Sequence, residues 1–433
     1  MARRLDSAGA GFSAAFDALL AARRGVAEDV DREAAAIVGA VRAGGDAALL
    51  DYTARFDRIG LDPRSMRLTE DERAAAARAA PNAVRDALVQ AAERIEAFHR
   101  RLMPADLDYR DDAGVRLGAR WRPLDAVGLY VPGGTAAYPS TVLMNALPAR
   151  VAGVGRIAMT VPTPDGGLDP AVMAAAEVAG VTEIYRVGGA QAVAALAYGT
   201  ETIRPVDKIV GPGNAYVAAA KRLVFGTVGI DMIAGPSEIL VVADAANEPE
   251  WIAADLLSQA EHDEDAQAIL ITDDGAFAAR VTDAAAGHLA GLARAAIAAA
   301  SWREHGAVIV VRALDEAPAL INRLAPEHLE LAVAEPERLA RAVTSAGAVF
   351  LGRHTPEAIG DYVAGPNHVL PTARSARFSS GLSPLDFLKR TTFVGCDAAS
   401  LARIGPAAVT LAEAEGLDAH ALSVALRLAG GPE

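Results

Sequence analysis

The chain has 433 residues, of which 52% are hydrophobic, so it can form two or three globular domains with large cores. Its formal net charge of −14, from 41 basic and 55 acidic residues, argues against a nucleic-acid partner, because nucleic-acid binding rests on a basic surface. The single cysteine, Cys396, excludes an intramolecular disulfide and a thiolate zinc cluster, so any metal must be held by nitrogen and oxygen.

No apolar run approaches the ~20 residues that a membrane helix needs, so we expect no membrane partner. The N-terminus has arginines but no apolar block ahead of Asp6, which predicts a mature cytoplasmic chain and no signal peptide. The first ~100 residues are helical in pattern, most clearly over residues 81–102. His99, near the end of that predicted helix, is interpreted as an exposed surface residue.

From residue 126 the pattern changes to strands that alternate with helices. The expected strands lie within residues 126–134, 156–164, 183–187, 207–210, 238–244, 266–272, 307–313, 329–333 and 346–352. This alternation predicts parallel, doubly wound α/β sheets, and we expect two such units, in tandem or one inserted in the other. After about residue 376 the plan breaks, and one or two terminal helices predict an appended arm.

Two glycine turns are candidate cofactor sites, at residues 188–189 and 211–213. Both follow a strand and open a helix, where glycines let a ligand approach the backbone and the helix N-terminus favours an anion. Gln191 and Asn214 stand at the start of the two helices. An ordinary turn, with Asn214 as a plain N-cap, is an equally good interpretation at this point.

Three further segments carry candidate chemistry. The polar and aromatic loop over residues 129–141 begins where a strand ends, and α/β proteins bind ligands there. Glu327 and His328 follow a proline and precede a strand, and a Glu-His pair suits acid–base catalysis near neutral pH. Ser237 stands just before another strand. A solvated loop for the pair and a turn for Ser237 are the structural alternatives.

Residues 355–361 predict a short helix. Thr355 is the expected N-cap, Pro356 the first helical residue and Glu357 an acid that favours the helix N-terminus. Asp361 lies at the end of this helix. His368 follows a Gly-Pro-Asn turn and is open to a purely structural interpretation.

A metal site is predicted from the nitrogen and oxygen donors. Gln259 and His262 lie a helical turn apart in an acidic helix end, where a bound cation or simple solvation would offset the unfavourable charge. Together with Asp361 and His420 they form a donor set that suits a zinc-like ion. Glu415 and His420 would lie about 140° apart on one helix, so only a bend would turn both to one small ligand.

These segments resemble the histidinol dehydrogenase family over residues 25 to 425. The resemblance is carried by several long blocks in order, among them YVPGGTAAYPSTVLMNALPARVAGV from residue 130, KIVGPGNAYVAAAKRLVFGTVGIDMIAGPSEILVVAD from residue 208, LLSQAEHDEDAQAILIT from residue 256, APEHLEL from residue 325 and AEGLDAH from residue 414. Such a series is far more specific than any single motif.

The resemblance implies a zinc-containing enzyme that oxidises L-histidinol through L-histidinaldehyde to L-histidine with two NAD, the last steps of histidine biosynthesis. It also implies a homodimer with a shared active site, one Zn²⁺ per subunit, and His420 supplied by the partner subunit. By resemblance, the metal ligands are Gln259, His262, Asp361 and His420. The implied NAD contacts are Tyr130, Gln191 and Asn214. The implied substrate contacts are Ser237, Gln259, His262, His328, Asp361, Glu415 and His420.

Glu327 and His328 match the acid–base pair of that family. His328 would take a proton in each oxidation, and Glu327 would activate the water that adds to the aldehyde. We expect two incomplete Rossmann-like domains: residues 26–125 with 238–375, carrying most metal and acid–base residues, and residues 126–237, binding NAD. Residues 1–25 and 376–433 are expected to be small helical segments that form a dimer arm.

Three alternatives remain open at this point. The first is a paralogue of the same fold that oxidises another amino- or sulfo-alcohol with zinc and NAD. The second is a non-catalytic NAD-binding or assembly protein. The third is a zinc hydrolase that uses Glu327 as its base and needs no nicotinamide.

Overall fold

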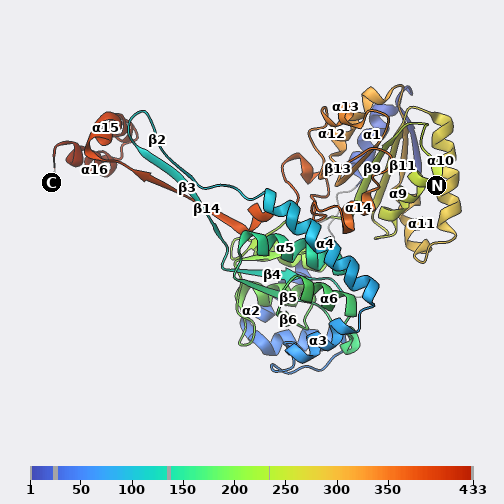
Figure 1. The fold of residues 1–433 in the computed structure, drawn as a ribbon, viewed down its shortest axis with the longest axis horizontal. Helices are drawn as coiled ribbons and strands as arrows, with labels where there is room; N and C mark the ends of the chain where they lie inside the picture. Colours follow the sequence, from blue (N-terminus) through green and yellow to red (C-terminus); the bar gives the residue numbers. More distant parts are fainter. Residues whose placement is uncertain (1, 23–27, 134–137, 234, 431–433) are drawn as a thin grey trace.

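The computed structural model describes residues 2–22, 28–133, 138–233 and 235–430. These residues form two α/β bodies and a thin arm that carries the C-terminus away from both (Figure 1). Residues 134–137 of the predicted functional loop lie outside the described residues.

The first body is built on six parallel strands in the order β1-β11-β10-β9-β12-β13. The strands are β1 (Arg3–Asp6), β9 (Glu238–Ala243), β10 (Gln267–Thr272), β11 (Ala307–Val310), β12 (His328–Ala332) and β13 (Ala348–Leu351). Without β1, the order by sequence is 3-2-1-4-5, which is a doubly wound sheet one strand short of the complete Rossmann arrangement.

Helices cover both faces of this sheet because its strands are apolar on both sides. Leu240 and Val242 of β9 point to a core with α1 (Phe12–Ala21), α12 (Ala317–Leu324) and α13 (Pro336–Ala340). Ile239 and Val241 point to the opposite core. That core is completed by α9 (Pro249–Ala260), α10 (Gly275–Leu289) and α11 (Ala295–Glu304). The short α14 (Glu357–Tyr362) follows β13.

The second body repeats the plan with five parallel strands in the order β6-β5-β4-β7-β8. These are β4 (Ala126–Tyr130), β5 (Arg156–Thr160), β6 (Glu183–Tyr185), β7 (Lys208–Val210) and β8 (Gly229–Ile230). The order is again 3-2-1-4-5. The prediction of two incomplete Rossmann-like domains is therefore confirmed.

Helices cover this sheet on both faces as well. One core contains α3 (Glu70–Arg78), α4 (Asn82–Arg101), α5 (Pro139–Ala152) and α6 (Pro170–Val178). The other contains α2 (Glu28–Asp57), α7 (Gly189–Tyr198) and α8 (Ala215–Val224).

The predicted domain boundaries were wrong in the N-terminal quarter of the chain. Strand β1 pairs with β11, so the N-terminal segment belongs to the first body and not to an arm. Helices α2 to α4 pack on the second sheet, where Leu88 and Ile95 share a core with Leu129. The second body is thus inserted into the first. Periodicity reveals an apolar helix face but not the sheet that the face will cover, so the sequence pattern left this assignment undetermined.

The arm also contains more of the chain than predicted. It is an antiparallel sheet of β2 (Leu107–Arg110), β3 (Arg116–Pro123) and β14 (Leu388–Gly395), followed by α15 (Ala398–Ala414) and α16 (Asp418–Leu428). Only the part after residue 376 was predicted. Large apolar side chains of α15 and α16 are exposed, including Leu411, Leu422 and Leu426 at 57–64%. Among the described residues, no helix is long and apolar enough to cross a membrane.

Helix α4 links the two bodies. The Arg94 guanidinium donates to the backbone oxygens of Val363 and Ala364 in the first body. His99, predicted to be exposed, is fully buried, with Nδ1 2.8 Å from the Ile95 carbonyl oxygen and Nε2 3.5 Å from the Asn367 amide. The segment just after α14 is therefore held by a helix of the other body.

Candidate active site

The candidate residues lie at the ends of strands in both sheets. Tyr130 is the last residue of β4, and the turns at residues 188–189 and 211–213 follow β6 and β7, so all three lie at the carboxyl edge of the second sheet. Glu327 and His328 stand at the amino end of β12, and Ser237 precedes β9, which is the neighbour of β12 in the first sheet. Along the sequence, only seven residues separate the end of β8 in the second sheet from the start of β9 in the first.

The backbone of β9 fixes the predicted acid–base pair. The Glu327 carboxylate accepts a hydrogen bond from the Glu238 N–H at 2.9 Å, and His328 Nδ1 lies 2.9 Å from the Glu238 carbonyl oxygen. Because a carbonyl only accepts, Nδ1 must carry the proton, which leaves the lone pair of the neutral ring on Nε2. His328 is thus oriented as a proton acceptor.

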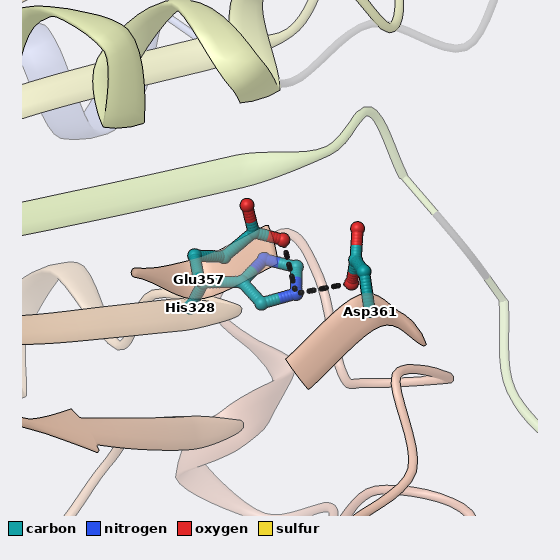
Figure 2. A group of neighbouring side chains, drawn as sticks. All are labelled: His328, Glu357 and Asp361. Atoms are coloured by element: carbon teal, nitrogen blue, oxygen red, sulfur yellow. Dashed lines mark ion pairs between the residues drawn. The ribbon is translucent and has the colours of Figure 1, made fainter. Parts of the chain in front are cut away.

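Figure 2 shows what surrounds that acceptor atom. His328 Nε2 lies 3.6 Å from Glu357 Oε1 and 3.7 Å from Asp361 Oδ1. Both His328 Nε2 and Glu357 Oε1 are buried and have no hydrogen-bond partner among the residues that the structure describes. Buried polar atoms are normally paired, so these atoms indicate a place for a ligand or an ion.

The end of α9 borders the same place. Ser258 Oγ donates to the second oxygen of Glu357 at 3.1 Å, while the Ser258 carbonyl oxygen lies 2.9 Å from His262 Nδ1. That contact engages Nδ1 and leaves Nε2 as the potential ligand atom of His262. The amide nitrogen of Gln259 is buried and has no partner in the described ranges. The acidic residues Asp263 to Asp265 are exposed, which matches the solvation alternative for most of this charge.

Burial sets the protonation of the site. It lowers the pKa of His328 and lowers the pKa of His368 to about 4, so both rings are neutral at pH 7. It raises the pKa of Glu327 and of Asp361 well above the ordinary range, and the Glu357 charge adds to both increases. A site that holds neutral imidazoles beside carboxyl groups of raised pKa is suited to proton transfer near neutral pH.

The residues present fit a divalent cation. Among the described residues, His328, Glu357 and Asp361 offer nitrogen and oxygen atoms within 4.8 Å of one another. This group shares only Asp361 with the predicted ligand set. Gln259 and His262 adjoin this group at the end of α9, on either side of the contacts that Ser258 makes with Glu357 and His262, but among the described residues only the three named side chains lie within that distance of one another.

The predicted NAD contacts also lie together. The Tyr130 hydroxyl accepts a hydrogen bond from the Gly189 N–H at 3.0 Å, and a Cβ placed on Gly211 would lie 2.0 Å from the Tyr130 carbonyl oxygen. The Gln191 side-chain oxygen is buried, and none of the described residues donates a hydrogen bond to it. Asn214 is exposed and accepts from the Val217 N–H at 3.1 Å, which is the N-cap geometry of the structural alternative.

Two predicted residues are not brought to this site within one chain. Glu415 and His420 are exposed on the arm, far from α14 in Figure 1. Glu415 caps α15, and Gly416, at φ +71°, turns the chain before α16, which carries His420. The bend that the sequence analysis required between the two residues is therefore present.

Glu357 and Glu330 were not predicted as site residues. The rule that favours acids at helix N-termini explained Glu357 without a site, yet its side chain is 1% exposed and faces His328. Pro356, and not Thr355, is the N-cap residue, and no side chain caps this helix. Glu330, two residues beyond the predicted pair on β12, is equally buried. No local pattern distinguishes a helix-favouring acid from a buried one.

Comparisons with known proteins agree with these features. A family model described as "Histidinol dehydrogenase" matches residues 21–428. The histidinol dehydrogenase of Rhodospirillum rubrum is 65% identical over 100% of both chains, and that of Ruegeria pomeroyi is 63% identical over 99% of both. The crystal structure of histidinol dehydrogenase from Elizabethkingia anophelis has a TM-score of 0.93 at 38% identity and covers 99% of this chain and 98% of that one.

Proposed function

The chain belongs to the histidinol dehydrogenase family, and we propose that it oxidises L-histidinol to L-histidine with zinc and two NAD at the amino end of β12. The observation that carries this proposal is the buried, unpartnered Nε2 of His328, oriented beside Glu357 and Asp361. The family is an NAD-dependent oxidoreductase family of histidine biosynthesis. The chain is 62–65% identical to relatives named histidinol dehydrogenase, and this identity favours histidinol over the substrate of a paralogue.

Residue by residue, the chain supplies the proton transfers. His328 Nε2 accepts the hydroxyl proton of the alcohol while a hydride passes to NAD from the carbon that bears the hydroxyl, which yields the aldehyde. Water then adds to the aldehyde with help from Glu327. His328 accepts a proton from the resulting diol as the second hydride leaves. Each turnover releases two NADH and, with a carboxylate product, three protons.

Gln259, His262 and Asp361 would hold the zinc ion, with His420 from a second copy of the chain. When bound, zinc supplies a Lewis-acidic template that orients the nitrogen atoms of the substrate. Tyr130, Gln191 and Asn214 would contact NAD at the carboxyl edge of the second sheet, where doubly wound sheets bind nucleotides. Ser237 and Glu415 would complete the substrate site.

A homodimer with a shared site is part of the same proposal. The arm exposes Leu411, Leu422 and Leu426 together with Glu415 and His420. Apolar side chains on such a thin element gain little free energy until a second surface covers them. Arm exchange between two chains would cover them and bring both polar residues to the site of the partner. The cytoplasmic location stays a prediction.

The test is an assay of the purified full-length chain with L-histidinol and NAD, with and without a chelator. We expect two NADH and one L-histidine per histidinol consumed, and loss of activity after zinc removal that added zinc restores. One NADH per histidinol consumed would mean that the reaction ends at the aldehyde. Turnover of another amino alcohol but not histidinol would identify the paralogue.

A further inference from the structure

The second sheet lacks the acid that such a sheet usually carries after its second strand. In doubly wound domains that bind NAD, an Asp or Glu near this point accepts hydrogen bonds from the adenosine ribose. Here the second strand is β5, which continues into Val161, Pro162 and Thr163 without an acid. The next acid, Asp165, is exposed and paired with Arg58 at 2.6 and 3.0 Å.

Asp57 occupies the missing position from a different element. It is the last residue of α2 and is 7% exposed. Its carboxylate accepts a hydrogen bond from the backbone of Thr163, just beyond β5. Within the described part of the chain, its Oδ2 atom is buried without a hydrogen-bond partner, and so is the hydroxyl of Thr163. A buried carboxylate oxygen with no donor indicates a hydroxyl-bearing ligand, because such atoms are rarely left unpaired.

The same corner adjoins the predicted NAD contacts. Pro162 packs beneath two glycines, since a Cβ on Gly133 or Gly188 would lie 2.7 or 2.5 Å from its ring. The negative charge of Asp57, after burial, contributes to the high pKa of Tyr130, whose hydroxyl binds the Gly189 N–H. Asp57 is therefore on the same edge as the glycine turns.

We propose that Asp57, with the hydroxyl of Thr163, binds the adenosine ribose hydroxyls of NAD and makes the site prefer NAD to NADP. This inference rests on the proposed NAD-dependent function. A carboxylate accepts hydrogen bonds from ribose hydroxyls but repels a 2′-phosphate. Arg58, the neighbouring cation, is already engaged by Asp165 and so does not offset that repulsion.

The test is calorimetric titration of the full-length chain with NAD, NADP and an NAD analogue that lacks the adenosine 2′-hydroxyl. We expect Asp57→Asn to weaken NAD binding about tenfold or more and to reduce the NAD-to-NADP preference by at least that factor. The natural chain should lose affinity for the deoxy analogue, whereas the variant should bind NAD and the analogue almost equally. Asp51→Asn, an exposed change on the same helix, is the matched control.

Other outcomes would overturn the inference. Unchanged NAD affinity in Asp57→Asn, or equal weakening of NAD, NADP and the analogue, would assign Asp57 a structural role. If Asp57→Asn does not fold, Thr163→Val removes an unpartnered hydroxyl and is judged by the same loss of discrimination against the analogue. Failure of histidinol turnover with intact NAD binding would reject the proposed function alone, because the titrations still decide the role of Asp57.

Discussion

At the residue scale, several carboxyl groups are buried close together at the site, and this raises their pKa values. Glu330 lies on β12, 1% exposed, against Asp255 and Glu357. Burial raises the pKa of Glu330 to about 9, and the charge of Asp255 and its hydrogen bond add to this increase. Burial likewise raises the pKa of Asp255 to about 6. Glu330 therefore keeps its proton in the folded chain at pH 7 but loses it on unfolding.

This difference predicts a pH-dependent gain in stability for Glu330→Gln. Below pH ~4.5 the side chain is protonated in both states and contributes nothing. As pH rises from there toward 9, the unfolded state loses the proton first, so the folded state of the natural chain loses several kcal/mol, at ~1.4 kcal/mol per unit. Glutamine removes this cost. The difference in Tm between variant and natural chain should therefore increase between pH 5 and pH 8.

The measurement is thermal unfolding of metal-free protein across that range. Glu335→Gln, an exposed change just beyond the same strand, should show a nearly constant difference in Tm. A constant difference for Glu330→Gln too would mean that Glu330 is ionised in the folded state.

Also at this scale, the sequence predicted the position of a site residue where the adjacent residues mark the end of one element and the start of the next. Glu327 and His328 follow a proline and precede a strand, and both lie where that junction predicted. The sequence around Glu357 and His99 has the pattern of a surface helix, yet both side chains are buried. Such a pattern does not indicate which other segment will cover the helix. Their burial depends on contacts with residues 29 and 268 positions away in the sequence, respectively.

At the element scale, a buried ion pair fixes the turn after β7. The Gly211 N–H donates to Asp231 at 2.8 Å, and the Lys221 ammonium donates to the Gly211 carbonyl oxygen at 2.9 Å. Lys221 and Asp231 pair with each other at 2% and 1% side-chain exposure. Glycine is required because φ at Gly211 is +114° and the Tyr130 backbone leaves no room for a Cβ. The glycine turn was predicted, but its support came from residues 10 and 20 positions along the chain.

Loss of this pair should weaken NAD binding more than histidinol binding. We expect the double variant Lys221→Met with Asp231→Asn to raise KM for NAD by about tenfold, since the turn loses two charge-assisted hydrogen bonds. KM for histidinol should change little. Lys221→Met alone should be the less stable protein, because it leaves the Asp231 charge buried without its partner.

Steady-state kinetics with both substrates and the Tm of each variant check this prediction. Arg222→Met, which removes the neighbouring surface pair with Asp31, is the control. A parallel rise in both KM values would contradict a specific role at the NAD turn.

At the scale of the whole molecule, the repeat of strands and helices predicted both sheets but not which segments belong together. Residues 3–6 and 307–310 pair across most of the chain, and β2 and β3 join β14 in the arm. Such contacts join segments hundreds of residues apart, so local spacing has no information on them. The resemblance, and not the spacing, placed His420 in the site of another subunit, and this remains a prediction.

Mixing of two inactive variants tests the shared site. In His328→Asn the body lacks its base, and in His420→Ala the arm lacks a metal ligand, so each homodimer should be inactive. A mixed dimer has one site with both defects and one site built from an intact body and an intact arm. After random exchange of chains in equal amounts, half of the dimers are mixed, and about a quarter of all sites should be active.

Activity should rise from near zero to about a quarter of the natural value after joint unfolding and refolding of the two variants. The same variants refolded separately and then combined are the control. No recovery in a mixture that contains mixed dimers would show that each chain completes its own site, and His420 would then need another role.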